Sequence, residues 1–435
     1  MKKNYILCVL LSAAAMGTAA QTERRLTVDE MFGLIEQNNS AVATQARGVD
    51  EATHSLAAAK SQRLPDINVS LSGSYNGNVV MTDRDFGNAH GIKQPRWGNS
   101  FGIEAQQIVY SGGAISSSIK LAELQKQRAE TLVQKAREGA RFTAMGYYLD
   151  LYKTVNGERV YKSNIELTEK LIDEIKAKHA QGVALKNDVT RYELQLEDLR
   201  LGLRRLNDQH EITNHELCNL LGIDTATRIV PDTAVTAMPA DSNNEAVWHG
   251  KAENQSTDMR LSELDLLSSR QQLKLAKSAM LPKLAVVAAD NFTGPFIYDL
   301  PPIDKNFNLW YVGVSVKYSL SSLFKDNHKV RQAKAAIARS EEQHRDTRLS
   351  VDNSVKDAYT LYRQSFADLR TRQKSVQLAT QNYQVVADRY LCQLALITDM
   401  VDASNIKLDA ELQEVNARIN TAFCYYRMKF AAGEL

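Results

Sequence analysis

The placement of proline constrains this chain more than any other feature of its sequence. None of the eight prolines lies between Arg96 and Val230 or between Ile303 and Leu435. Because proline breaks helices, both stretches are free to be helical over their whole length. A helix of about 70 residues is roughly 100 Å long at 1.5 Å per residue. Helices of that length exclude a compact globular core.

Apolar residues recur at alternating steps of three and four on both sides of a turn from Tyr390 to Asp402. This 3.5-residue period is the seam of a coiled coil, so the turn between the two helices is predicted to be the tip of a helical hairpin. The residues of the seam before the turn are Val355, Tyr359, Tyr362, Phe366, Leu369, Val376, Tyr383, Ala387 and Tyr390, with the polar Gln373 and Thr380 at the two remaining seam positions. Those after it are Val401, Leu408, Leu412, Val415, Ile419, Ala422 and Tyr426.

The chain repeats its own organisation once. The segment 59–65 resembles 276–282, and three further pairs lie 211 residues apart: Gly102 and Gly313, Ala122 and Ala333, and Asp188 and Asp399. We therefore predict one unit used twice: a helix, a strand opened by proline, a loop, a second strand, a very long helix, a tip and a return helix.

The predicted boundaries follow from this repeat. The first repeat covers 21–63 and 64–221, with strands at about 66–79 and 97–110 and a helical hairpin over 112–221 whose tip is near 182–188. A connecting segment covers 222–250. The second repeat covers 251–435, with strands at about 283–291 and 308–320 and a hairpin over 322–430 whose tip is near 391–399.

Residues 1–20 have the pattern of a cleaved secretory signal. Lys2 and Lys3 give a positive start, a short apolar run follows, and the small residues 18–20 form a cleavage site. Cys8 lies too early to be a lipid acceptor, so we expect no lipid anchor. The cysteines that remain after cleavage, at 218, 392 and 424, imply no disulfide framework.

The composition bounds the possible partners. The chain is 44% hydrophobic and 24% charged, with a net charge of +2, which gives no signal for nucleic-acid binding. After the signal, no run approaches a membrane-spanning helix. If the protein meets a membrane, it does so with strands.

Four segments alternate apolar and polar residues, as membrane-spanning strands do. The clearest are 67–76, where Ile67, Val69 and Leu71 alternate with polar residues, and 310–320, where Val312 and Val314 do so. A half-buried soluble sheet has the same alternation. Export and polar, glycine-rich loops favour a barrel. Four strands are too few to close a barrel, and the unpaired backbone groups of an open edge are unfavourable in lipid. Three chains are therefore predicted to supply twelve strands to one barrel.

With these features the chain resembles the TolC family of outer membrane efflux proteins. The resemblance covers essentially the mature chain. It is carried by the duplication, by the Leu-Pro pairs at 64–65 and 281–282, and by the tips at 182–189 and 390–402. It implies a mainly α fold with a small β part: a trimer with a twelve-stranded outer membrane barrel, continued by a long periplasmic α-helical barrel. It also implies an exit duct for efflux or type I secretion, with a periplasmic adaptor, an inner membrane transporter and outer membrane lipid as partners.

The resemblance also implies roles for residues at the tips. Asp399 and Asp402 would form rings of carboxylates at the periplasmic entrance, while Tyr390, Asn187 and Asp188 would belong to the network that holds the tips closed. On one chain alone, carboxylates in a first helical turn need no role beyond complementing the helix dipole. Two positions depart from the family pattern: Gln393 replaces a glycine, and Ala395 replaces an arginine that bridges neighbouring coils in some members. Asn187 stands where some members have a threonine, and its side chain can still donate a hydrogen bond.

The apolar residues at the tips have no core beneath them, so we predict that they are exposed and dock the adaptor. The predicted adaptor-contact residues are Gly182, Val183, Ala184, Leu185, Gln393, Leu394, Ala395 and Leu396.

Signatures of catalysis are missing from the sequence. It contains no His-Glu-x-x-His motif, phosphate loop, nucleophile elbow or kinase signature, so we expect no enzyme activity, cofactor or metal. Two function classes stay open: a passive conduit opened by its partners, and a structural or adhesive coiled-coil stalk anchored by a small barrel. The presence of a tip at equivalent positions of both repeats favours the conduit. A measurement of conductance in planar bilayers distinguishes a conduit from a stalk.

Overall fold

The computed structural model describes residues 23–232, 244–297 and 302–435. The predicted signal at 1–20 and part of the predicted connecting segment lie outside the described residues. The chain forms two compact units. Unit 1 comprises Met1–Arg47, Thr131–Leu261 and Asp346–Leu435. Unit 2 comprises Gly48–Glu130 and Ser262–Arg345.

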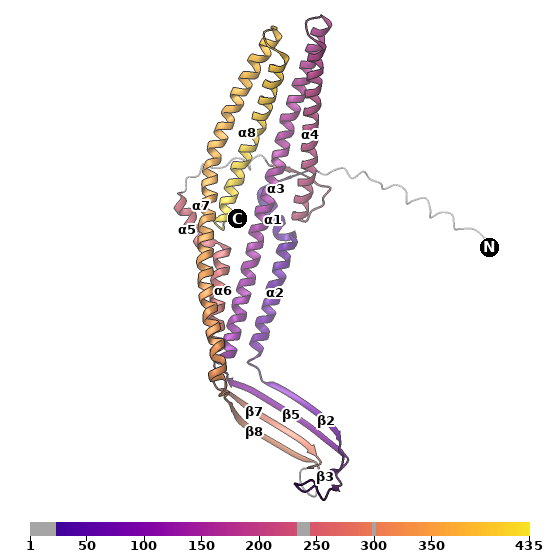
Figure 1. Cartoon of the computed structure of the whole chain (residues 1–435), viewed down its shortest axis with the longest axis vertical. Coiled ribbons are helices and arrows are strands. Elements are labelled where there is room, and N and C mark those ends of the chain that lie inside the picture. The colour runs from indigo at the N-terminus through magenta and orange to yellow at the C-terminus, as the bar shows by residue number, and fades with distance from the viewer. Residues whose placement is uncertain (1–22, 233–243, 298–301) are drawn as a thin grey trace, which may run out of the picture. The chain divides into compact units, whose positions relative to one another are not determined.

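Long helices dominate the fold, as the proline-free stretches predict (Figure 1). Helix α3 spans Ala114–Ala180 and α7 spans Ser322–Leu391, which gives them 67 and 70 residues. Each is followed by a short tip and a return helix, α4 over Lys186–Leu221 and α8 over Ile397–Ala431. The predicted hairpins and both tip positions are therefore present in the structure.

The opening helix of each repeat is broken in two, where the sequence predicted a single helix. In the first repeat α1 spans Val28–Asn38 and α2 spans Ser40–Ser61; in the second, α5 spans Glu245–Gln255 and α6 spans Thr257–Ser278. The Asn39 side chain explains the first break. Its oxygen accepts hydrogen bonds from the Ala41 and Val42 N–H groups at 3.0 and 3.1 Å, which caps the new helix.

A small parallel sheet in unit 1 was not predicted. Strand β1, Glu23–Leu26, pairs with β6, Arg228–Pro231. The buried Tyr148 hydroxyl of α3 donates a hydrogen bond to the Leu26 carbonyl at 2.6 Å. Four-residue strands are too short to produce an alternation that could be recognised in the sequence.

Unit 2 contains the predicted four strands. They are β2 (Asp66–Tyr75), β5 (Trp97–Tyr110), β7 (Lys283–Gly294) and β8 (Phe307–Lys317). They form one antiparallel sheet in the order β2-β5-β7-β8. The first strand ends earlier than predicted, because the loop after it contains a separate hairpin of β3 (Val79–Met81) and β4 (His90–Ile92). No helix among the described residues is long and apolar enough to cross a membrane.

Candidate functional site: the hairpin tips and the sheet

The two hairpin tips have the same backbone turn. In each, two backbone N–H groups bond back to the last turn of the long helix, which is the Schellman pattern of a helix end. In the first tip the bonds are Gly182 N–H to His179 C=O at 2.9 Å and Val183 N–H to Lys178 C=O at 2.9 Å. In the second they are Gln393 N–H to Tyr390 C=O at 3.0 Å and Leu394 N–H to Arg389 C=O at 2.7 Å.

The turn needs a residue with a positive φ, and the two repeats supply different residues. Gly182 has φ +76°, and Gln393, 211 residues further on, has φ +61°. Glycine adopts this left-handed region without penalty, whereas a side chain with a Cβ does so at a cost of about 1–2 kcal/mol. The departure from glycine seen in the sequence therefore leaves the turn intact but strains it.

The two tip aspartates cap the return helices. The Asp188 carboxylate accepts a hydrogen bond from the Leu185 N–H at 3.2 Å, and the Asp399 carboxylate accepts one from the Leu396 N–H at 3.0 Å. Both thus satisfy a backbone donor that a helix start leaves unpaired. Asp399 and Asp402 are exposed on the single chain. Their predicted role at a constriction depends on other copies and stays a prediction.

An apolar cluster joins the two hairpins just behind the tips. It draws residues from all four long helices, so it belongs to neither hairpin alone. Its buried members are Leu171, Ile172, Ile175, Val189, Tyr192, Leu196, Ile397 and Met400. Tyr383, Val386, Ala387, Tyr390 and Val401 pack against it.

Polar contacts also cross from one hairpin to the other. The Lys178 ammonium of α3 donates to the Leu391 carbonyl at the end of α7, at 3.1 Å. The Gln195 amide of α4 donates to the Asn405 side-chain oxygen of α8 at 2.6 Å. The first contact also places a cation at the negative end of the α7 dipole. Neither contact could be predicted from the sequence, because the partners lie 213 and 210 residues apart and meet only where the hairpins pack.

The Asp188 carboxylate lies near enough to the Tyr390 phenol to act on its ionisation, and the predicted role of both residues in holding the tips closed stays a prediction. Burial, with the Asp188 carboxylate nearby, raises the pKa of the Tyr390 phenol to about 12. The phenol therefore stays neutral at physiological pH and can act as a hydrogen-bond donor. Asn187 is exposed, and its role in holding the tips stays a prediction.

The tips expose large apolar side chains, as predicted. Leu185 is 70% exposed, and Leu394 and Leu396 are 68% and 69% exposed. Ala184 and Ala395 were also predicted to be exposed, but both are half-buried. Ala184 packs against the apolar cluster, so the exposed surface is formed mainly by the leucines.

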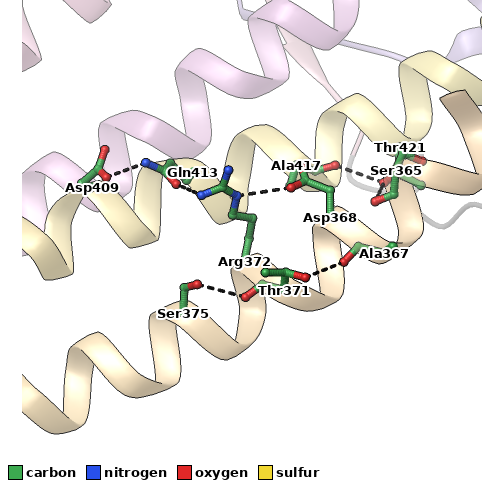
Figure 2. A network of polar contacts seen from close by, with 10 residues as sticks. All are labelled: Ser365, Ala367, Asp368, Thr371, Arg372, Ser375, Asp409, Gln413, Ala417 and Thr421. Carbon is green, nitrogen blue, oxygen red and sulfur yellow. Dashed lines mark hydrogen bonds and ion pairs between the residues drawn. The ribbon is translucent and has the colours of Figure 1, made fainter.

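Further from the tips, a chain of polar contacts joins α7 to α8 within the second hairpin (Figure 2). The Arg372 guanidinium donates to Asp368 at 3.3 Å and to the Gln413 side-chain oxygen, and Gln413 in turn donates to Asp409 at 2.5 Å. Every one of these residues has a partner in the network, and the contact between Arg372 and Gln413 links the two helices of the hairpin. No group of His, Cys, Asp or Glu residues in the described chain could hold a metal ion.

The sheet of unit 2 exposes its apolar face. On its outer strands Ile67, Leu71 and Val314 are 66%, 82% and 69% exposed. Within the described residues β2 and β8 each pair with one strand only, so both edges of the sheet are unpaired. A soluble sheet would bury such a face, and an open edge is a surface for further strand pairing.

Comparison with known proteins agrees with this geometry. A family model described as outer membrane efflux protein matches residues 32–223 and 248–433. VceC, an outer membrane protein of Vibrio cholerae, is 14% identical with a TM-score of 0.76, over 93% of this chain and 96% of VceC. The CmeC outer membrane channel of Campylobacter jejuni is 16% identical with a TM-score of 0.76, over 94% of this chain and 85% of CmeC. CusC is 12% identical with a TM-score of 0.79, over 93% of this chain and 92% of CusC. A search of curated proteins found no match.

Proposed function

Because the chain belongs to the outer membrane efflux protein family, we propose that three copies form an exit duct that crosses the outer membrane and the periplasm. In this duct the four-stranded sheets of three copies close a twelve-stranded barrel in outer membrane lipid. The long helices form a periplasmic tube, which an adaptor and an inner membrane transporter open at its tips.

The observation that carries the proposal is the sheet with an exposed apolar face and two unpaired edges. In lipid the apolar face is favourable, but each unpaired backbone group costs several kcal/mol. Pairing β8 of one copy with β2 of the next removes all open edges at once. Twelve strands leave a channel, whereas eight would be filled by side chains.

The entrance of the duct would be formed by the tips of the second repeat. Three-fold symmetry brings three copies each of Asp399 and Asp402 towards the axis, one helical turn apart. Rings of carboxylates attract cations and oppose anions. Capping of the Leu396 N–H uses one oxygen of Asp399 and leaves the other free to face the lumen. Tyr390, Asn187 and Asp188 would hold this entrance closed.

The exposed leucines of the tips would be the docking surface for the adaptor. A patch of large apolar side chains at the end of a coiled coil is unfavourable in water and marks a contact surface. Leu185 belongs to the first tip, and Leu394 and Leu396 to the second, so one adaptor could engage both hairpins of a chain.

Replacing two of these leucines with charge tests the assembly and the docking together. Leu185→Glu/Leu396→Glu should lose copurification of the adaptor while the detergent-solubilised protein keeps the mass of three copies. Leu185→Met/Leu396→Met, which keeps the apolar surface, should retain the adaptor. Cys392 is exposed whereas Cys218 and Cys424 are buried, so maleimide labelling of Cys392 reports tip coverage directly. Adaptor retention by the Glu variant would refute the docking surface, and a native mass of one copy would refute the assembly.

A further inference from the structure

A pocket in unit 1 contains the buried side chain of Glu138. The pocket has a volume of about 450 Å³ and is lined by residues of α3, of α7, of the start of α6 and of the C-terminal part of α8. That volume lies within the range of pockets that hold small molecules. All of the lining residues belong to unit 1 of one chain, so the pocket does not depend on other copies.

Glu138 of α3 is only 4% exposed, and both of its hydrogen-bond donors are neutral. The Gln134 amide donates to one carboxylate oxygen and the Thr257 hydroxyl donates to the other, each at 3.0 Å. An ionised carboxylate has about four acceptor sites, so both oxygens can accept a further hydrogen bond. Burial raises the pKa of Glu138, because the charged form is unfavourable away from water. A cation bound beside the carboxylate would offset that cost.

The basic residues close to Glu138 pair with other acids. The Lys135 ammonium pairs with Asp258 at 2.6 Å, and the Arg141 guanidinium, whose charge also acts on Glu138, pairs with Glu36. In the part of the chain that the structure describes, no Lys or Arg forms an ion pair with Glu138. Buried carboxylates usually pair with a cation or a metal ion. Glu138 is therefore the group in the pocket that a positively charged ligand would contact.

Three phenylalanines form an aromatic wall in the same pocket. The Phe142 ring stacks on the Phe430 ring, with the centroids 4.6 Å apart and an angle of 11° between the planes. The Phe423 ring lies 5.5 Å from Phe142 on the centroid measure. None of the three rings is fully buried, and Phe430 is 38% exposed. Aromatic faces attract cations and stack against planar rings, so this wall suits a ligand that has both.

We propose that this pocket binds a small organic cation that carries an aromatic ring, with the charged group at Glu138 and the ring against the phenylalanines. An anion would be repelled by the carboxylate, and a neutral ring would leave the carboxylate without its cation. A metal ion requires several ligands together, and the described residues bring no such group of His, Cys, Asp or Glu together. In the duct proposed above, a molecule of this class would be cargo. That last assignment rests on the proposed function, whereas the pocket itself is formed by one chain.

Calorimetric titration of the detergent-solubilised full chain with ethidium, a planar aromatic cation, tests the pocket. Glu138→Gln keeps an oxygen that accepts a hydrogen bond but removes the charge, so it should weaken binding by about tenfold or more. Phe430→Leu removes one aromatic face and should weaken binding by about threefold. The matched control is Glu166→Gln, which removes an exposed carboxylate of the same helix that pairs with Lys170. This control should bind ethidium as wild type does.

The aromatic anion 1-naphthalenesulfonate should not compete with ethidium for the wild-type protein. Equal affinity of wild type and Glu138→Gln, or no binding of ethidium to wild type, would overturn the proposal. If circular dichroism showed that Glu138→Gln does not fold, competition by the anion or unchanged binding to Phe430→Leu would overturn it instead. The native mass separates this proposal from the duct. Binding that depends on Glu138 in a protein of one copy would refute the duct alone, and three copies without binding would refute the pocket alone.

Discussion

At the scale of single residues, Gln393 stands at a position of positive φ that favours glycine, in a turn that both repeats share. Its φ of +61° matches the +76° of Gly182 in the first tip, and the same two backbone hydrogen bonds follow. The surrounding contacts of the hairpin therefore hold glutamine in a conformation that favours glycine.

Replacing Gln393 with glycine should relieve this strain. We expect Gln393→Gly to raise the stability of the second tip by about 0.5–1 kcal/mol, the left-handed penalty less the backbone entropy that glycine loses. Gln393→Ala is the control, because alanine keeps the Cβ and hence the strain. Denaturant unfolding followed by circular dichroism measures both. A gain with alanine equal to that with glycine would show that the strain is not in the backbone.

The sequence could predict some residue roles and not others, for a physical reason. The position of Asp188 and Asp399 just after a turn can be predicted from the neighbouring sequence, since helix capping acts over three residues. The roles of Lys178 and Gln195 cannot be predicted from the neighbouring sequence, because their hydrogen-bond partners lie 213 and 210 residues away. Such contacts depend on the packing of whole hairpins.

At the scale of elements, the strands of unit 2 were predictable because each is long enough to show its alternation. The pairs β3–β4 and β1–β6 were missed, since strands of three or four residues carry no such pattern. The break at Asn39 was missed because asparagine also occurs inside helices, and its capping bonds are visible only in the structure.

Two adjacent positions on β8 test which face of the sheet meets lipid. Val314 lies on the apolar face and Ser315 on the opposite one. Arginine on the lipid face costs about 2–4 kcal/mol near the middle of the bilayer, whereas a lumen position tolerates charge. Val314→Arg should therefore lower the amount of trimer recovered from outer membranes well below wild type, and Ser315→Arg should not. Similar recovery of the two variants would mean that the apolar face does not meet lipid.

At the scale of the whole molecule, the proline-free stretches and the 211-residue repeat predicted the long helices and the tips, and the alternation of apolar and polar residues predicted the four strands. A single chain leaves three kinds of surface uncovered: an apolar sheet face, open strand edges and the leucines of the tips. In the proposed duct, copies of the chain account for the edges, lipid for the face, and an adaptor for the leucines. Each of these three partners is inferred from a surface that a single chain leaves exposed.

The central claim is that three copies form a conduit narrowed by the carboxylates of the second tips. Single-channel recording in planar bilayers tests it most directly, by comparing wild type with Asp399→Asn/Asp402→Asn. Asparagine keeps an oxygen to accept the Leu396 N–H, so the cap survives while the charge is removed. Wild type should conduct, prefer cations and be blocked by a trivalent cation added on the periplasmic side. The variant should conduct without that preference or block. Equal selectivity and block in both proteins would place the constriction elsewhere, and the absence of conductance would contradict the conduit itself.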